Sequence, residues 1–196
     1  MSLLVQNMIQ GAEAEITIQG EEVLKERPEK KYRHEKLDTR IREERTSEEV
    51  KNIEKARKHG VNIPETEKTG KTSMKQDRVK GKPLKKILPS EPELMEEVGK
   101  NIGLLHGTGL VHGDLTTSNI MYDGEIWLID LGLSETTERT EDQAVDIYLL
   151  KKTLETSHPE QSTELWEGFK QGYRDFDDSE EVLETMEEVK RRGRYK

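Results

Sequence analysis

Polar residues of the kind that handle phosphate stand in two short stretches of the chain's second half. Residues 112–119 read "HGDLTTSN" and residues 128–132 read "LIDLG". Phosphoryl transfer from ATP needs a carboxylate that orients the attacking hydroxyl, and hard oxygen ligands for Mg²⁺. We therefore predict Asp114 as the catalytic carboxylate and Asn119 and Asp130 as the magnesium ligands.

A hairpin is needed to bring these two stretches together. Residues 119–130, "NIMYDGEIWLID", place two short apolar runs around Asp123-Gly124, which is the strongest short-range hairpin signal. Such a hairpin returns the chain so that Asp130 faces the same space as Asp114. A lone His-Gly-Asp or Asp-Leu-Gly is usually only a turn, but the order of the two motifs after an amphipathic helix favours a site.

The order of elements predicts an α+β protein in two lobes. Strands, a helix and further strands come first, and a mainly helical half with the embedded hairpin follows. We divide the chain into an N-terminal lobe, residues 1–80, and a C-terminal lobe, residues 81–196. The first holds a sheet and one long helix, and the second holds the catalytic loop and a basic tail.

Hydrophobic spacing and punctuating residues predict the elements of the N-terminal lobe. Two strands are expected on either side of Gly20. A helix over residues 35–59 is expected to end at Gly60. A strand pair then turns at Gly70.

The C-terminal lobe is expected to begin with a helix over residues 91–107, with Ser90 as its N-cap. Helices follow from about residue 141 to the end of the chain. On the first of these helices, three apolar residues are expected to lie on one face: Val145, Leu149 and Leu150.

Composition excludes several classes of protein. The 196 residues contain no Cys, and the five His are scattered, so disulfides, Cys-based zinc sites and a His metal cluster are not expected. A net charge of −9 argues against a protein that coats nucleic acid. No apolar run reaches the roughly 18 residues of a membrane span. With no signal peptide visible either, we expect a cytoplasmic protein without membrane partners.

The motifs resemble the protein-kinase-like superfamily, and this resemblance implies a protein-kinase-like two-lobed fold with a small β-rich N-lobe and a reduced, mainly helical C-lobe. Within it, "HGDLTTSN" is similar to the small atypical Ser/Thr kinase/ATPase subunit of the KEOPS complex, archaeal type, which serves threonylcarbamoyladenosine formation on tRNA. Further segments share this resemblance: "GAEA" at 11–14, "LKERPEKKYRHEKLD" at 24–38, "RTSEE" at 45–49 and "EDQAVDIYLLKKTLETSH" at 141–158. The resemblance implies ATP and Mg²⁺ as cofactors. It implies three partners: the threonylcarbamoyl-transferase subunit, a small helper subunit and tRNA.

The resemblance also assigns roles in the N-terminal lobe. Lys25 is the residue expected to hold the phosphates, and it needs a carboxylate from the long helix. The family's spacing points to Glu49, whereas Glu44 is nearer the separation in ordinary protein kinases. The other residues expected to contact ATP are Gly11, Ala12, Glu13 and Ala14 as a reduced phosphate loop, and Gln76, Asp77 and Val79 at the adenine.

Three further residues in or near the catalytic loop have expected structural roles. His112 is expected to pack and hydrogen-bond the loop rather than to do chemistry. Gly113 stands where regulated kinases have the Arg that receives a phosphorylated activation loop, so we predict no such switch. Asp146 resembles the helix Asp that holds the catalytic-loop backbone.

The sequence "GKTS" at residues 70–73 imitates part of a Walker A loop. That loop needs a Gly five residues before its Gly-Lys pair, and the residue there is Glu65. We therefore interpret Gly70 as part of a β-turn.

The basic tail has two interpretations. Positive charge there suits contact with tRNA phosphates, but it also suits the C-terminal end of a helix dipole. The residues concerned are Lys190, Arg191, Arg192, Arg194 and Lys196.

Two other functions remain as alternatives to the Ser/Thr kinase/ATPase. One is a small-molecule phosphotransferase of the aminoglycoside or choline type, and the other is a non-catalytic adaptor that binds nucleotide. Because the chain begins with Met1, we expect a separate subunit rather than part of a fusion.

Overall fold

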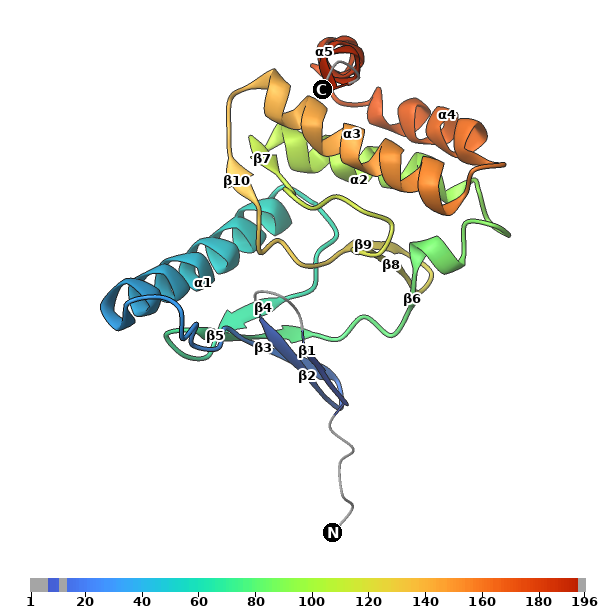
Figure 1. The fold of residues 1–196 in the computed structure, drawn as a ribbon. Coiled ribbons are helices and arrows are strands. Elements are labelled where there is room, and N and C mark those ends of the chain that lie inside the picture. Colours follow the sequence, from blue (N-terminus) through green and yellow to red (C-terminus); the bar gives the residue numbers. More distant parts are fainter. Residues whose placement is uncertain (1–6, 11–13, 194–196) are drawn as a thin grey trace.

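An antiparallel five-stranded sheet with one long helix forms the first part of the chain (Figure 1). The computed structural model describes residues 7–10 and 14–193. The spatial order of the strands is β1-β2-β3-β5-β4, so β3 is held by a neighbour on each side. The strands are β1 (Asn7–Gln10), β2 (Glu15–Gln19), β3 (Glu22–Glu26), β4 (Thr66–Lys68) and β5 (Ser73–Asp77).

The register of β3 places Lys25 in the middle of the sheet. Lys25 pairs with Ile16 on β2 and with Met74 on β5. The predicted turn at Gly20 is present, with φ of +63°, which glycine adopts without a Cβ penalty. The strand pair around Gly70 is also confirmed as β4 and β5. Strand β1 was not predicted, because "NMIQ" carries too little alternation to stand out.

The long helix α1 (Glu35–Lys58) confirms the prediction over residues 35–59. Its inner face buries Val50, Ile53 and Ala56. The helix ends before Gly60, whose φ of +85° lets the chain turn back. The Val61 N–H then donates a hydrogen bond to the Ala56 carbonyl. The apolar end of α1 therefore lies in the core, while its N-terminal half extends beyond the sheet (Figure 1).

The second part of the chain is mainly helical (Figure 1). Helix α2 packs against α4, and α3 packs against α5. The predicted hairpin around Asp123-Gly124 is confirmed as β8 and β9. The elements are β6 (Lys82–Pro83), η1 (Leu84–Lys86), α2 (Leu94–Gly107), β7 (Leu110–Val111), β8 (Ile120–Tyr122), β9 (Ile126–Leu128), β10 (Glu135–Thr136), α3 (Thr140–Ser157), α4 (Ser162–Tyr173) and α5 (Ser179–Gly193). The predicted lobe boundary between residues 80 and 81 falls in the connection from β5 to β6.

Two details of the predicted helices were wrong. Ser90 does not cap α2: its hydroxyl donates to the Ile87 carbonyl, and the helix begins only at Leu94. On α3, Val145 is 48% exposed, whereas Ala144 and Ile147 are fully buried. Adjacent helix positions point about 100° apart, so an error of one residue in the buried face moves a side chain from the core to solvent.

A close approach of α2 and α4 depends on glycine. A Cβ on Gly172 would lie 1.8 Å from the Glu96 carbonyl oxygen, and one on Gly99 would lie 2.1 Å from the Phe169 carbonyl oxygen. Neither position has room for a methyl group, so the two helices touch backbone to backbone. This contact holds the first turns of α2 against α4.

The Gly172→Ala variant tests this contact. We expect its free energy of unfolding to fall by about 1–3 kcal/mol, because the added methyl overpacks the interface. Gly168→Ala is the matched control on the same helix, since its Cβ would meet Met95 Cβ at an ordinary 3.4 Å. Thermal or urea denaturation measures both. Equal effects of the two variants would contradict the close approach.

Candidate active site

The amine of Lys25 connects three separate elements. Its Nζ donates to Glu49 Oε1 at 2.7 Å and to Asp130 Oδ1 at 2.5 Å. Lys25 comes from β3, Glu49 from α1, and Asp130 from the end of the hairpin. The Glu49 and Lys25 side chains are 1% and 10% exposed, so their charges meet largely away from water. The sheet, the long helix and the second half of the chain thus converge on one ammonium group.

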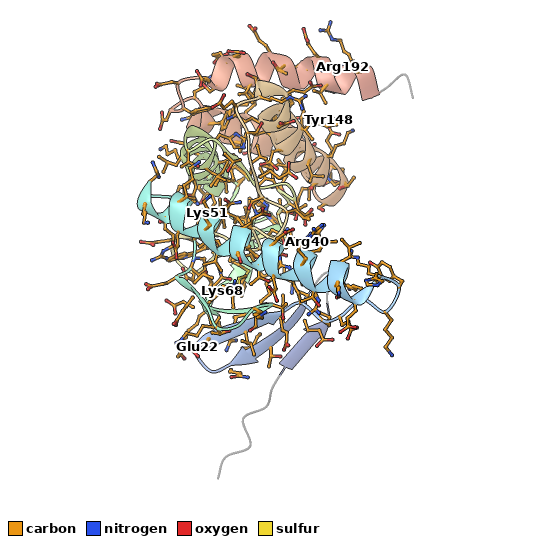
Figure 2. All side chains as sticks on the ribbon, turned by 90° about the vertical axis from the view of Figure 1, so that its left-hand side faces the viewer. Glu22, Arg40, Lys51, Lys68, Tyr148 and Arg192 are labelled. Atoms are coloured by element: carbon orange, nitrogen blue, oxygen red, sulfur yellow. The ribbon has the colours of Figure 1, made fainter. Side chains whose placement is uncertain are left out.

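The structure decides between the two glutamates proposed as partners of Lys25. Glu49 makes the contact. The alternative, Glu44, was wrong. Its side chain is 59% exposed on the outer side of α1, and its Oε1 lies 3.7 Å from Arg40 Nε. Figure 2 labels Arg40 on α1, which lies in front in that view.

Asp130 is held in an unusual backbone conformation. Its φ is +61°, in the left-handed region that non-glycine residues rarely adopt. Partial removal of water would by itself raise the pKa of its carboxyl group, but the neighbouring Lys25 ammonium outweighs this and holds the pKa below its ordinary value. A Cβ on Gly132 would lie 3.1 Å from Asp130 Oδ1 and 3.2 Å from Lys25 Nζ. The glycine therefore leaves room for both charged groups.

Asn119 is oriented by Asp114. The Asn119 amide nitrogen donates to the carbonyl and to the carboxylate Oδ2 of Asp114, both at 2.9 Å. The amide oxygen consequently points away from Asp114. The Ile129 N–H donates to the Asn119 carbonyl, which ties the catalytic loop to the strand that leads into Asp130.

Asn119 and Asp130 are the two residues that suit a magnesium ion. Mg²⁺ is typically bound in such sites by one or two protein oxygens, with phosphate and water supplying the rest. The described part of the chain contains no group of three or more His, Asp or Glu side chains placed to hold a metal ion by themselves. An amide and one carboxylate therefore fit a metal that arrives with a nucleotide.

Asp146 anchors the catalytic loop, as predicted. Its carboxylate accepts from His112 N–H at 2.7 Å and from Gly113 N–H at 3.0 Å. Burial would raise the pKa of this carboxyl group, but the hydrogen bond from His106 and the other donors lower it, so it stays ionised. Behind it, the Tyr173 hydroxyl lies 2.8 Å from the His106 ring. The α4 packing thus supports the loop through a buried chain of hydrogen bonds.

His112 and Gly113 have structural roles. The His112 ring accepts from Asp114 N–H at Nδ1 and lies 3.1 Å from the Ile129 carbonyl at Nε2, so it packs and bonds the loop as predicted. Gly113 has φ of +79°, and a Cβ there would lie 2.1 Å from the Leu133 carbonyl oxygen. Any side chain at this position, arginine included, would therefore clash with the backbone carbonyl of Leu133.

The other proposed ATP contacts are only partly visible. Ala14 is buried at the start of β2, and Gly11, Ala12 and Glu13 lie outside the described residues. The Gln76 side chain donates to Thr66, and Asp77 N–H donates to the Glu65 carbonyl. An adenine contact from Asp77 would therefore use its carbonyl. The roles of Gln76, Asp77 and Val79 stay predictions.

The basic tail lies far from Lys25. Figure 2 places Arg192 at the end of the molecule opposite Glu22 of the sheet. The described tail residues have acidic neighbours: Lys190 lies near Glu187, Arg191 near Glu188, and Arg192 3.0 Å from Glu141. Arg194 and Lys196 lie outside the described residues. The tRNA assignment stays a prediction.

Sequence reasoning missed Arg27. The residue is 4% exposed, and its Nη2 donates to Glu49 Oε2 at 2.6 Å. The available signal was its spacing, since residues two apart on a strand face the same side.

Residues 18–152 match the sequence profile of the RIO domain. This covers more than half of the chain. The chain belongs to the RIO-domain family.

Relatives extend the likeness over nearly the whole chain. The KEOPS complex subunit Bud32 of Pyrococcus abyssi is 37% identical over 185 residues, which cover 89% of this chain and 84% of that protein. The probable bifunctional tRNA threonylcarbamoyladenosine biosynthesis protein of Methanosarcina barkeri is 42% identical over 192 residues. That match covers 94% of this chain and 35% of the relative, so the chain spans about a third of the bifunctional protein's length.

Solved structures confirm the two-lobed, kinase-like α+β fold of this RIO-family chain. The Rio2 kinase from Chaetomium thermophilum, solved as an ADP/Mg²⁺-phosphoaspartate complex, superposes with a TM-score of 0.69 at 16% identity. The superposition covers 96% of this chain and 70% of the Rio2 chain. None of the described helices is long and apolar enough to cross a membrane.

The lowered pKa of Asp130 predicts a pH dependence of stability. The ionised form is favoured in the folded state, so this contribution is fully present above the unfolded pKa of about 3.9. It is lost as pH falls through the lower, folded pKa. We expect the wild-type chain to lose stability as the pH falls below about 4, and Asp130→Asn to lose less, measured by urea denaturation at each pH.

The size of this effect is limited by exposure, because the Asp130 side chain is 45% exposed and water screens the pair. The exposed Asp177 provides the control, and Asp177→Asn should leave the acid slope nearly unchanged. A slope that Asp130→Asn does not alter would contradict the pairing with Lys25.

Proposed function

We propose that this chain is an ATP-dependent phosphotransferase of the Ser/Thr kinase type with ATPase activity. The observation that carries the proposal is the shared position of Lys25, which contacts both Glu49 and Asp130 while Asp114 orients Asn119. This is the residue set that phosphoryl transfer requires: a lysine for the phosphates, two metal ligands and a carboxylate for the acceptor. Membership in the RIO-domain family supports it.

Each side chain then has a defined task. Lys25, held by Glu49, neutralises phosphate charge, and Asn119 and Asp130 hold Mg²⁺. The bound metal supplies further positive charge and fixes the triphosphate orientation. Asp114 orients the attacking hydroxyl of serine, threonine or water and receives its proton. Lys25 must exchange its contact with Asp130 for a phosphate oxygen when the nucleotide binds.

The names of the relatives support a place for this activity in tRNA modification. One relative is a KEOPS complex subunit, and others are bifunctional tRNA threonylcarbamoyladenosine biosynthesis proteins. We propose that the chain works with a threonylcarbamoyl-transferase, with a small helper subunit and on tRNA, in the cytoplasm. Whether the transferase is a separate chain or a fused one does not change the roles of the site residues.

ATP turnover by variants of the purified chain tests the proposed function. Asp130→Ala should abolish γ-phosphate release, because a metal ligand and a partner of Lys25 are lost together. Asp114→Asn should lower the rate by about 10²–10⁴-fold, since the acceptor loses its base. Glu44→Ala is the control, because that exposed carboxylate lies outside the site. Undiminished turnover in Asp130→Ala would count decisively against the proposal.

The same assay separates the alternatives. A small-molecule kinase would show turnover stimulated by choline or aminoglycoside acceptors. A nucleotide-binding adaptor would bind MgATP without releasing phosphate. We expect neither result. Phosphate from ATP should instead be transferred to a protein hydroxyl or to water.

A further inference from the structure

Arg27 shares the carboxylate that holds the phosphate-binding lysine. Glu49 gives one oxygen to each cation: Oε1 accepts from Lys25 at 2.7 Å, and Oε2 accepts from Arg27 Nη2 at 2.6 Å. Arg27 follows β3 two residues after Lys25, and its N–H continues the strand pairing to the Thr72 carbonyl. The strand thus presents both cations on the same face.

This arrangement makes the orientation of Glu49 independent of Lys25. A carboxylate held only by the lysine would be free to rotate when Lys25 leaves Asp130 for a phosphate. A planar guanidinium fixes a carboxylate more rigidly than an ammonium does. The Arg27 and Glu49 side chains are 4% and 1% exposed, so little water competes for the contact.

Arg27 also attaches α1 to the sheet. Its carbonyl accepts from Arg42 Nη1 at 3.2 Å, and its Nη1 lies 3.4 Å from the Thr46 hydroxyl. Arg42 is itself held by the buried Asp38 at 2.7 Å. Positions 42, 46 and 49 are spaced by four and three residues, so they share one face of the helix. One arginine thus contacts two turns of α1.

A second contact ties α1 to the segment after Gly132. The Asn52 amide donates to the hydroxyl of Ser134 at 3.0 Å and lies 3.3 Å from its carbonyl. That segment is in turn paired with β7 through Glu135 and Thr136. The helix is therefore held on both sides of Glu49, with no phosphorylated residue needed to assemble the site.

We propose that Arg27 is a positioning residue for phosphoryl transfer: it holds Glu49 and α1 in place, so that Lys25 is aimed at the phosphates without an activation switch. This inference rests on the proposed function and adds a residue to it. Arg27 acts through Glu49, so its effect must depend on that carboxylate.

A double-mutant cycle tests this dependence. Arg27→Met should lower kcat for MgATP hydrolysis by about tenfold or more, with a smaller change in KM for ATP. In the Glu49→Gln background the same substitution should cost less than about twofold, because the carboxylate it positions is already gone. Arg27→Lys keeps a positive charge and should recover part of the rate. Arg174→Met, which removes a half-exposed arginine that pairs with Glu180 after α4, is the control.

Rates are expressed per folded protein, with folding checked by circular dichroism. Where Arg27→Met does not fold, the cycle is run with Arg27→Lys, which should then show a smaller loss that again disappears with Glu49→Gln. A folded Arg27 variant at the wild-type rate overturns the inference, as does an equal loss in both backgrounds. Absence of turnover in the wild-type chain overturns the proposed function as well, so the two failures are distinguishable.

Discussion

The contact of Lys25 with two carboxylates makes separate parts of this chain depend on one another. A lysine ammonium that is mostly removed from water needs charged partners. Here they come from α1, through Glu49, and from the end of the hairpin, through Asp130. For the buried Lys25–Glu49 pair, removing one partner typically costs about 3–5 kcal/mol, whereas the half-exposed Asp130 contributes less. The N-terminal sheet, the long helix and the end of the hairpin are therefore coupled through one amine.

The charged side chains of the site balance one another. Lys25 and Arg27 are compensated by Glu49 and Asp130. A triphosphate entering this space would bring negative charge, and a magnesium ion held by Asn119 and Asp130 would supply positive charge. With the proposed roles, Lys25 would turn to a phosphate oxygen while Arg27 keeps Glu49 in place. The same side chains would then serve both stability and chemistry.

Much of this site was predictable because its signals are local in sequence. Asp114, Asn119 and Asp130 follow from two short motifs and a hairpin whose Asp-Gly turn is easily recognised. Glu49 was harder, because α1 carries several glutamates and its apolar spacing is loose; only the family resemblance favoured Glu49. Arg27 was missed, since a chain rich in Lys and Arg gives no reason to single it out until the fold shows its burial. The errors at Ser90 and Val145 arose where a short turn delays a helix start and where one residue shifts a helix face.

We expect Lys25, Asn119 and Asp130 to enclose a metal-bound triphosphate. The decisive experiment is a crystal structure of the chain with a non-hydrolysable ATP analogue and Mn²⁺, located by its anomalous signal. It should contain one manganese ion bound by Asn119 and Asp130, and Lys25 Nζ within hydrogen-bonding distance of a phosphate oxygen while still paired with Glu49. A nucleotide bound elsewhere, or a metal that contacts neither Asn119 nor Asp130, would contradict it.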